Sequence, residues 1–323
     1  MILLMRKQTL ATAPTDPTWF WIGAALLGHT GWGAYPVFAR YLQTVSHLPG
    51  LSMLAAANGV VLVLIGWHLW HHASRSALVS PVAWLFALAV VGRSVTNVLA
   101  ASYTLAVYVQ MIALTTPFLV ALLGATLFGE RIPRYTLPAI AVSLLGGVLV
   151  LSDTAGTSLL TLSLTTNDMI GMGLSFLSSL FLACYMLLIR RSAQRDLTGE
   201  TMLLIQLLTL VLASGILSLL VGEDWSSWAR LGQDGWLAFG TFALFVLLGA
   251  NIAQISTIRR LGAPFVSSMF GWRLVTTLLL ASLLLGEQLT RLWQLLGIAL
   301  ILGAVSLYVW YTATHPLPPE PVH

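Results

Sequence analysis

The chain has 323 residues, of which 58% are hydrophobic and only 8% are charged, and its formal net charge is +4. A soluble domain carries about 25% charged residues, so this composition, with a mean hydropathy of +0.88, excludes a soluble globular protein. Unbroken apolar stretches of about 20 residues predict membrane-spanning helices and exclude a transmembrane β-barrel, whose strands alternate in polarity. The single cysteine, Cys184, excludes an intrachain disulfide and a cysteine-based metal site.

The apolar stretches, which end at charges, prolines or glycines, predict ten spans. In chain order these spans cover residues 18–40, 51–70, 82–103, 105–127, 134–151, 168–190, 201–221, 235–257, 262–285 and 290–311. They predict a domain organisation of a polar N-terminal segment 1–17, a five-helix repeat 18–151, a linker 152–167, a second repeat 168–311 and a proline-rich tail 312–323. The fifth and tenth spans have few polar residues, so we expect them to pack outside any central cavity.

The distribution of basic residues predicts the orientation in the membrane. An even number of spans places both termini on one side, and ten of the fifteen lysines and arginines lie on that side. Three lie on the other side, and Arg93 and Arg273 fall inside spans. Cytoplasmic loops are enriched in lysine and arginine. We therefore expect a multi-pass protein of the cell membrane with both termini in the cytoplasm.

The two groups of five spans are related in sequence. Gly129-Glu130 closes the fourth span and Gly286-Glu287 closes the ninth, and the same offset of 157 aligns Arg134 with Arg291. Each glutamate stands four residues before its arginine, a spacing that favours an ion pair where a helix continues, and we interpret the repeated pair as structural. Because five is odd, the second group begins on the side where the first ended. The sequence thus predicts an all-α integral membrane protein of ten transmembrane helices in two inverted repeats, as in many secondary transporters.

Two segments carry a resemblance to a known family. They are AASYTLAVYVQMIALTTPFLVALLGATLFGERIPRYTLPAIAVSLLGGVLVL in the first half and RRLGAPFVSSMFGWRLVTTLLLASLLLGEQLTRLWQLLGIALILGAVSL in the second. With these segments the sequence resembles the EamA-type branch of the drug/metabolite transporter superfamily. The resemblance implies ten helices, a central cavity and export or exchange of small metabolites. The sequence departs from the family's usual pattern in the ninth span, where Thr116-Pro117 of the first half is matched by Arg273-Leu274.

Arg93 and Arg273 lie near the middle of the third and ninth spans. An arginine at the centre of a span costs about 2.5–3.5 kcal/mol on insertion scales, so it usually faces a partner or a water-filled cavity. All eleven acidic residues fall outside the spans or at their edges. Two unmatched guanidinium groups favour a substrate with a carboxylate, a phosphate or another anionic group, which arginine holds with a planar fork of donors. The alternative is that each guanidinium binds backbone carbonyls or hydroxyls, such as those of Thr96, Thr276 and Thr277, and locks helices together.

The first span contains GHTGWGAYPVF, which predicts a helix that is kinked or locally unwound, as in the broken helices that line transporter sites. His29 in this stretch is the one histidine well inside a span and is the candidate proton carrier. A histidine bonded to a neighbouring hydroxyl is the competing interpretation. Because no span interior contains an acidic residue, a facilitator or an exchanger is at least as well supported as proton coupling.

Aromatic and amide side chains on the same spans are expected to line the cavity, the aromatics by stacking on the substrate and the amides by hydrogen bonding. The alternative for each residue is packing between helices. The predicted substrate-binding residues are Arg93, Arg273, Trp272, Asn97, Gln254, Asn251, Trp32, Tyr35, Tyr185, Gln110 and His29.

The spans contain no HExxH, GxSxG or glycine-rich phosphate motif, so we expect no enzyme, no catalytic residue, no metal and no cofactor. The predicted function is a secondary transporter, an exporter or exchanger of small metabolites that are amino-acid-like or otherwise anionic, working by alternating access. An intramembrane enzyme and a non-transporting membrane scaffold are the alternatives. The expected partners are a small-molecule substrate and the lipid bilayer but no nucleic acid, and a homodimer is left open.

Overall fold

The computed structural model describes residues 18–74, 80–129, 132–133, 135–151, 164–193, 198–261, 269–287 and 291–315. Within these ranges every regular element is a helix. In chain order the helices are α1 (Thr18–Thr44), α2 (Gly50–His72), α3 (Pro81–Tyr103), α4 (Ala106–Ala113), α5 (Thr116–Phe128), α6 (Thr136–Leu151), α7 (Thr166–Ala193), α8 (Gly199–Val221), the 3-10 helix η3 (Trp225–Arg230), α9 (Gln233–Thr241), the π-helix η4 (Phe242–Gly249), α10 (Ala250–Leu261), α12 (Gly271–Leu285) and α13 (Leu292–Thr314).

Seven helical segments in the described ranges are long and apolar enough to cross a membrane. They are α2, α3, the joined α4 and α5, α7, α8, the stretch from α9 into α10, and α13. Helices α6 and α12 are apolar but have only 16 and 15 residues, and α1 has 27 residues but is not among the seven. The helical membrane architecture is therefore confirmed, whereas the full count of ten spans stays a prediction.

The first span was predicted to be kinked or locally unwound, and the local unwinding is wrong, whereas the kink stays a prediction. Helix α1 runs without a break from Thr18 to Thr44 and contains Pro36 in its interior. Its glycines serve close helix packing instead: an added Cβ at Gly28 or Gly31 would lie 3.1 or 2.6 Å from an alanine Cβ of α10. At Gly33 it would meet the backbone carbonyl oxygen of Arg273 in α12. Small residues of this kind let membrane helices approach each other closely.

The fourth span, predicted as one helix, is broken between α4 and α5. Pro117 lacks an N–H group, so the helix loses a hydrogen bond at this point. The hydroxyls of Thr115 and Thr116 donate to the carbonyl oxygens of Ile112 and Ala113, 2.7 and 2.6 Å away. In the second half, α12 begins at Gly271, the position that the sequence repeat aligns with this break. Residues 262–268, which the sequence assigned to the ninth span, lie outside the described residues.

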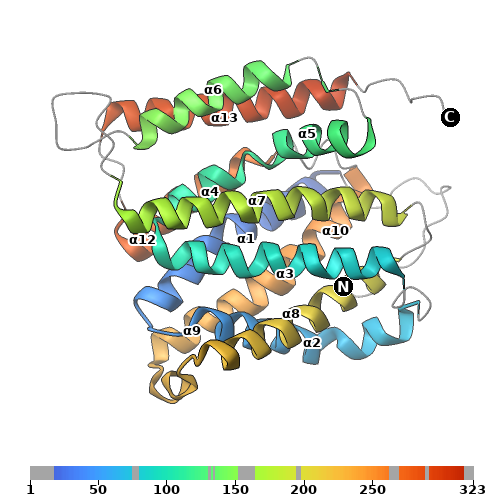
Figure 1. Cartoon of the computed structure of the whole chain (residues 1–323), viewed down its shortest axis with the longest axis vertical. Coiled ribbons are helices and arrows are strands. Elements are labelled where there is room, and N and C mark those ends of the chain that lie inside the picture. The colour runs from blue at the N-terminus through green and yellow to red at the C-terminus, as the bar shows by residue number, and fades with distance from the viewer. Residues whose placement is uncertain are drawn as a thin grey trace.

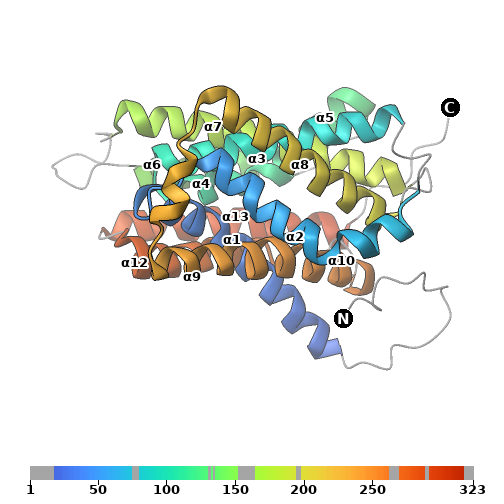
Figure 2. The same cartoon turned by 90° about the horizontal axis from the view of Figure 1, so that it is seen from below.

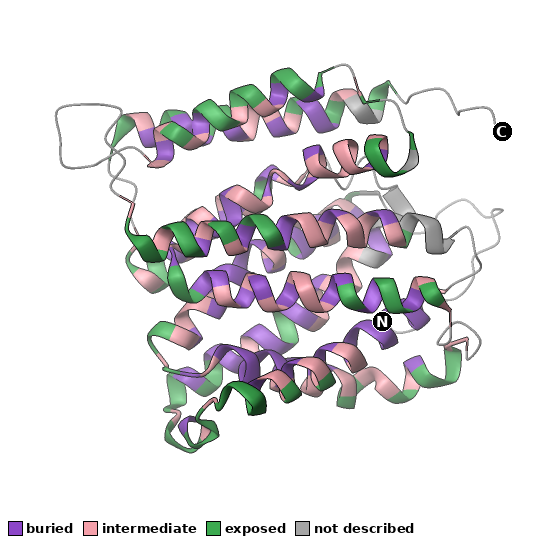
Figure 3. Ribbon diagram, viewed as in Figure 1, coloured by how far each residue is buried: buried purple, intermediate pink, exposed green. Residues whose placement is uncertain are grey.

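Helices α6 and α13 lie side by side at one edge of the bundle and pack mainly on each other (Figure 1). Gly146 and Gly297 permit this contact, because an added Cβ at either one would lie 2.6 or 2.5 Å from the carbonyl oxygen of the other. The fifth and tenth predicted spans are therefore peripheral, as expected. Many of their side chains are exposed, whereas buried residues gather around the middle helices (Figure 3).

Helix α1 occupies the middle of the remaining bundle, although its first turns project beyond the other helices (Figure 2). It packs against α3, α4, α10 and α12. The other principal helix pairs are α3 with α7 and α2 with α8, followed by α3 with α8 and α5 with α7. Side chains from the middle of α1 consequently face helices of both sequence repeats, and this arrangement positions the site described next.

Candidate functional site

The two arginines predicted inside spans come together around one side chain of α1. The guanidinium carbon of Arg93, on α3, lies 5.4 Å from the ring centre of Trp32. That of Arg273, on α12, lies 5.8 Å from the same ring centre. The two guanidinium carbons are therefore less than 12 Å apart, although they come from different repeats. Cation–π contacts of this kind attract a guanidinium to the electron-rich faces of an aromatic ring.

The Arg93 guanidinium is held by aromatic faces. Besides Trp32, it lies 5.1 Å from the ring centre of Tyr185 on α7. Tyr185 is fixed in turn, because its ring stacks on Phe86 with a centroid distance of 5.0 Å and its hydroxyl donates to Gln206 Oε1 over 3.2 Å. Within the described residues the side chain of Arg93 makes neither a hydrogen bond nor an ion pair. Its N–H donors are thus available to another acceptor.

The Arg273 guanidinium has one hydrogen-bond partner in the described part of the chain. Its Nε donates to Nδ1 of His29 over 2.9 Å, and its carbon lies 4.4 Å from the ring centre of Phe270. The Nη2 group is buried and has no hydrogen-bond partner among these residues. His29 is only 2% exposed, and its ring meets the edge of Phe270 at a centroid distance of 5.4 Å. A buried donor without an acceptor is costly, so this Nη2 group is open to an acceptor from a ligand.

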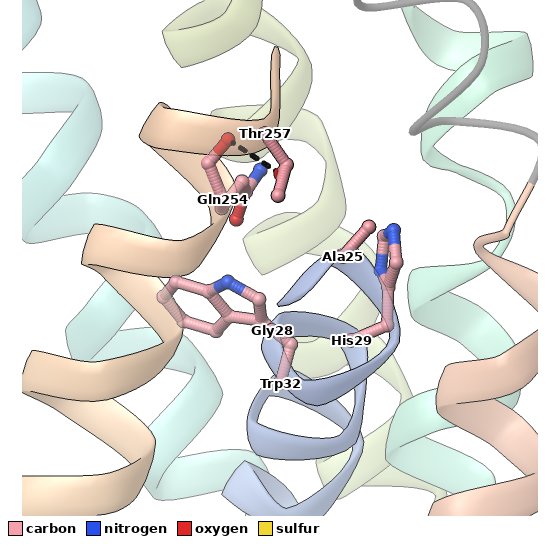
Figure 4. A pocket seen from close by; sticks show the side chains of 6 residues that line it. All are labelled: Ala25, Gly28, His29, Trp32, Gln254 and Thr257. Atoms are coloured by element: carbon pink, nitrogen blue, oxygen red, sulfur yellow. Dashed lines mark hydrogen bonds between the residues drawn. The ribbon is translucent and has the colours of Figure 1, made fainter. Parts of the chain in front are cut away.

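A small pocket adjoins this pair of arginines. It is lined by Ala25, Gly28, His29, Trp32, Gln254 and Thr257. Figure 4 shows Trp32 and Gln254 on one side of the pocket and His29 on the other. The indole Nε1 of Trp32 is buried without a hydrogen-bond partner in the described ranges. In this conformation the pocket has no room for a water-sized molecule, so a solute could enter only if the surrounding helices moved apart.

The other predicted site residues have mixed environments. Tyr35 is 8% exposed and packs on Phe242 with a centroid distance of 5.2 Å. The Asn251 amide donates to the carbonyl of Leu247, one turn earlier along the same helical stretch. The indole of Trp272 donates to Thr30 Oγ1 over 3.0 Å and is 41% exposed.

Two further amides from the predicted set, Asn97 and Gln110, lie between helices. Asn97 on α3 donates to Ser178 Oγ over 3.4 Å, while its Oδ1 is buried without a partner in the described part of the molecule. Gln110 on α4 is 5% exposed. The structure thus brings together Arg93, Arg273, Trp32, Tyr185 and His29, with Gln254 beside them.

A third arginine, Arg40, was not singled out by the sequence. Its Nε pairs with Glu287 Oε1 at 3.0 Å, and its Nη1 donates to the backbone carbonyls of Ala101 and Thr104. Glu287 also accepts the backbone N–H groups of Ala106 and Val107 over 3.2 and 3.4 Å, at the start of α4. The ion pair suggested by the spacing of Glu287 and Arg291 is therefore replaced by a long-range pair with Arg40. Glu130, its counterpart, lies outside the described residues.

A glycine-glutamate pair that the sequence analysis passed over has the same role. Gly222 ends α8 with a positive φ of 73°, as Gly286 ends α12 with a φ of 66°. Glu223 then accepts the N–H groups of Leu51 and Ser52, 2.9 and 2.7 Å away, at the start of α2. A carboxylate at a helix N-terminus satisfies free N–H groups and opposes the helix dipole. The Gly-Glu pair at residues 222–223, which repeats the pairs at 129–130 and 286–287, could have indicated this cap from the sequence.

Comparison with known proteins gives the class. A sequence model of the EamA-like transporter family matches residues 19–152 and 169–310, so the chain belongs to this family of membrane transporters of small molecules. One solved crystal structure is similar with a TM-score of 0.58 and 19% identity, covering 89% of this chain and 96% of that one. This likeness supports the fold alone. No curated protein matches the chain in sequence.

Proposed function

We propose that the protein is a secondary transporter that exports or exchanges small metabolites with an anionic group, amino-acid-like molecules among them, by alternating access across the cell membrane. The observation that carries this proposal is the position of Arg93 and Arg273 around Trp32 inside the helical bundle. Neither guanidinium is paired with a carboxylate in the described part of the chain. An anion in this site would supply the acceptors that the two arginines lack.

The competing interpretation, in which the arginines only lock helices together, has less support. The hydroxyls expected to bind them donate elsewhere: Thr96 to Gly92, Thr276 to Trp272 and Thr277 to Gly33, all backbone carbonyls 2.6 to 3.0 Å away. Arg273 does bind His29, but its buried Nη2 is left without a partner in the described ranges. A guanidinium used only as a structural link would be expected to satisfy its buried donors.

The helix packing supports an inverted repeat and alternating access. Replacing each helix by its counterpart in the other repeat converts the contact of α1 with α10 into that of α7 with α3. The contact of α1 with α12 is converted into that of α7 with α5, and the pairs α2 with α8 and α6 with α13 are each converted into themselves. Two such halves around a midplane site are the arrangement by which secondary transporters expose one site to either side in turn. The arginine-rich loops favour cytoplasmic termini.

The test is a thermal-shift experiment with the purified full-length protein in detergent. Acetate, benzoate, glutamate and inorganic phosphate serve as probes, and wild type is compared with Arg273→Gln and Arg93→Gln. Arg230→Gln is the matched control, because Arg230 is exposed and its partner is Asp224 at the surface. We expect at least one anion to raise the melting temperature of wild type and the control, and to have little effect on the two other variants. No stabilisation by any anion, or equal stabilisation of Arg273→Gln, would contradict the anionic site.

Transport itself is tested in proteoliposomes with the anion that stabilises the protein. We expect saturable uptake that is accelerated by the same anion inside the vesicles, and a large loss of uptake in Arg273→Gln. Binding without any flux would support the non-transporting scaffold instead.

A further inference from the structure

The bond between His29 and Arg273 fixes the chemical form of the imidazole. Arginine has only donors, so Nδ1 of His29 must act as the acceptor of the 2.9 Å bond from Arg273 Nε. The imidazole is therefore neutral in this bond and carries its proton on Nε2. The ring is 2% exposed and rests edge-on against Phe270, which restricts its rotation.

This bond also determines which N–H groups of the Arg273 guanidinium remain available to a ligand. With Nε occupied, the terminal groups Nη1 and Nη2 are the donors left, and neither has a hydrogen-bond partner in the described part of the chain. Those two groups project in parallel from one carbon and match the two oxygens of a carboxylate in a bidentate pair. The guanidinium carbon also lies over the rings of Trp32 and Phe270, 5.8 and 4.4 Å from their centres, and these contacts restrict its movement.

We infer that His29 is a positioning residue that holds Arg273 with its terminal N–H groups toward the substrate, and that the group bound there is the carboxylate of a small monocarboxylate. This inference rests on the proposed anion site and adds its geometry and its ligand class. The adjacent pocket is lined largely by small or uncharged groups. A carboxylate needs fewer donors than a phosphate, whose additional oxygens would have to be desolvated against such a lining.

The experiment uses a pair of amide substitutions in the full-length protein. In His29→Asn the amide oxygen takes the place of Nδ1 and accepts the Arg273 Nε–H, whereas in His29→Gln the amide is one carbon further from the backbone. We expect the apparent Kd for benzoate to stay within about threefold of wild type in His29→Asn and to rise at least about tenfold in His29→Gln. Both variants are expected to melt at nearly the same temperature without ligand. Inorganic phosphate at the same concentrations is expected to stabilise none of the proteins.

A double-mutant cycle separates positioning from a general packing role. In the Arg273→Gln background the two His29 variants are expected to bind benzoate equally weakly, because the side chain that they position is gone. If His29→Gln does not fold, Arg273→Lys provides the same test. A lysine ammonium cannot bind His29 and also present two parallel donors, so a loss of at least about tenfold is expected.

The outcomes separate this inference from the proposed function. Binding of benzoate that is abolished by Arg273→Gln but equal in His29→Asn and His29→Gln would overturn the positioning role and leave the anion site standing. Preferential binding of phosphate would overturn the carboxylate assignment. Benzoate binding that survives Arg273→Gln would remove the site itself, and with it both proposals.

Discussion

Arg40 and Arg273 both place a guanidinium among packed helices, but they differ in how far their donors are satisfied by the protein. Arg40 has a carboxylate, Glu287, at 3.0 Å and two backbone carbonyls as acceptors. Arg273 has one imidazole and the faces of two aromatic rings, and its buried Nη2 has no acceptor in the described ranges. The ion pair of Arg40 holds helices in place, whereas the unpartnered Nη2 donor of Arg273 could still bind a ligand.

The region around Arg40 connects several helix ends. Glu287 joins the end of α12 to the start of α4, and Arg40 joins the end of α1 to the last turn of α3. Thr104, after α3, continues the network by donating to Asp168 in the first turn of α7 over 2.7 Å. Such a network fixes one end of the bundle, while the two arginines around Trp32 are restrained mainly by weaker aromatic contacts.

The largest loss of stability is expected for Glu287→Ala. It leaves the partly buried Arg40, whose side chain is 20% exposed, without its carboxylate and removes the cap from α4, so the free energy of unfolding is expected to fall by about 2–3 kcal/mol. Glu223→Ala is the matched control, because Glu223 caps α2 but pairs with no arginine in the part of the chain that the structure describes. Loss of that cap is expected to cost about 1–2 kcal/mol. Denaturant unfolding in detergent measures both, and equal losses would show that the ion pair adds nothing.

No loss of stability is expected for Arg273→Gln in the absence of ligand. The variant removes a buried charge that has no carboxylate partner, so the free energy of unfolding should stay unchanged or rise by about 1 kcal/mol. Arg40→Gln, which leaves Glu287 without its cation, should instead lower it by about 2–3 kcal/mol. A comparable loss in Arg273→Gln would mean that this arginine is as structural as Arg40.

The smallest effect concerns Asp224, in the loop between α8 and α9. Hydrogen bonds from Ser226 and the nearby Arg230 hold the pKa of this carboxyl below its usual value. A lowered pKa stabilises the folded chain above the pKa of the unfolded state, about 3.9, and this contribution disappears as the pH falls through the folded value. Wild type is therefore expected to melt slightly above Asp224→Asn at pH 6, and the two melting temperatures should begin to converge below about pH 4 and coincide once the pH lies below the lowered pKa of the folded state. A difference that persists in acid would point to packing instead.

Much of the architecture could be predicted because its causes are local. Apolar stretches of membrane length set the helices, and the peripheral place of α6 and α13 follows from their few polar residues. The break between α4 and α5 has a local cause too, in Pro117. The apolar character of residues 105–127 nevertheless predicted one unbroken helix. The glycines of α1 were misread for the opposite reason, since glycine permits both unwinding and close packing and only the neighbouring helix decides between them.

The sequence by itself determined that the chain is a helical membrane protein with a duplicated core, and that Arg93 and Arg273 lie in spans that contain no acidic residue. These properties depend on hydropathy, periodicity and the count of charges along the chain. Only the tertiary structure decided that both arginines meet at Trp32, that His29 accepts from Arg273, and that Glu287 pairs with Arg40 rather than with Arg291. Contacts between residues hundreds of positions apart depend on how helices pack, and spacing along the chain carries no information about such partners.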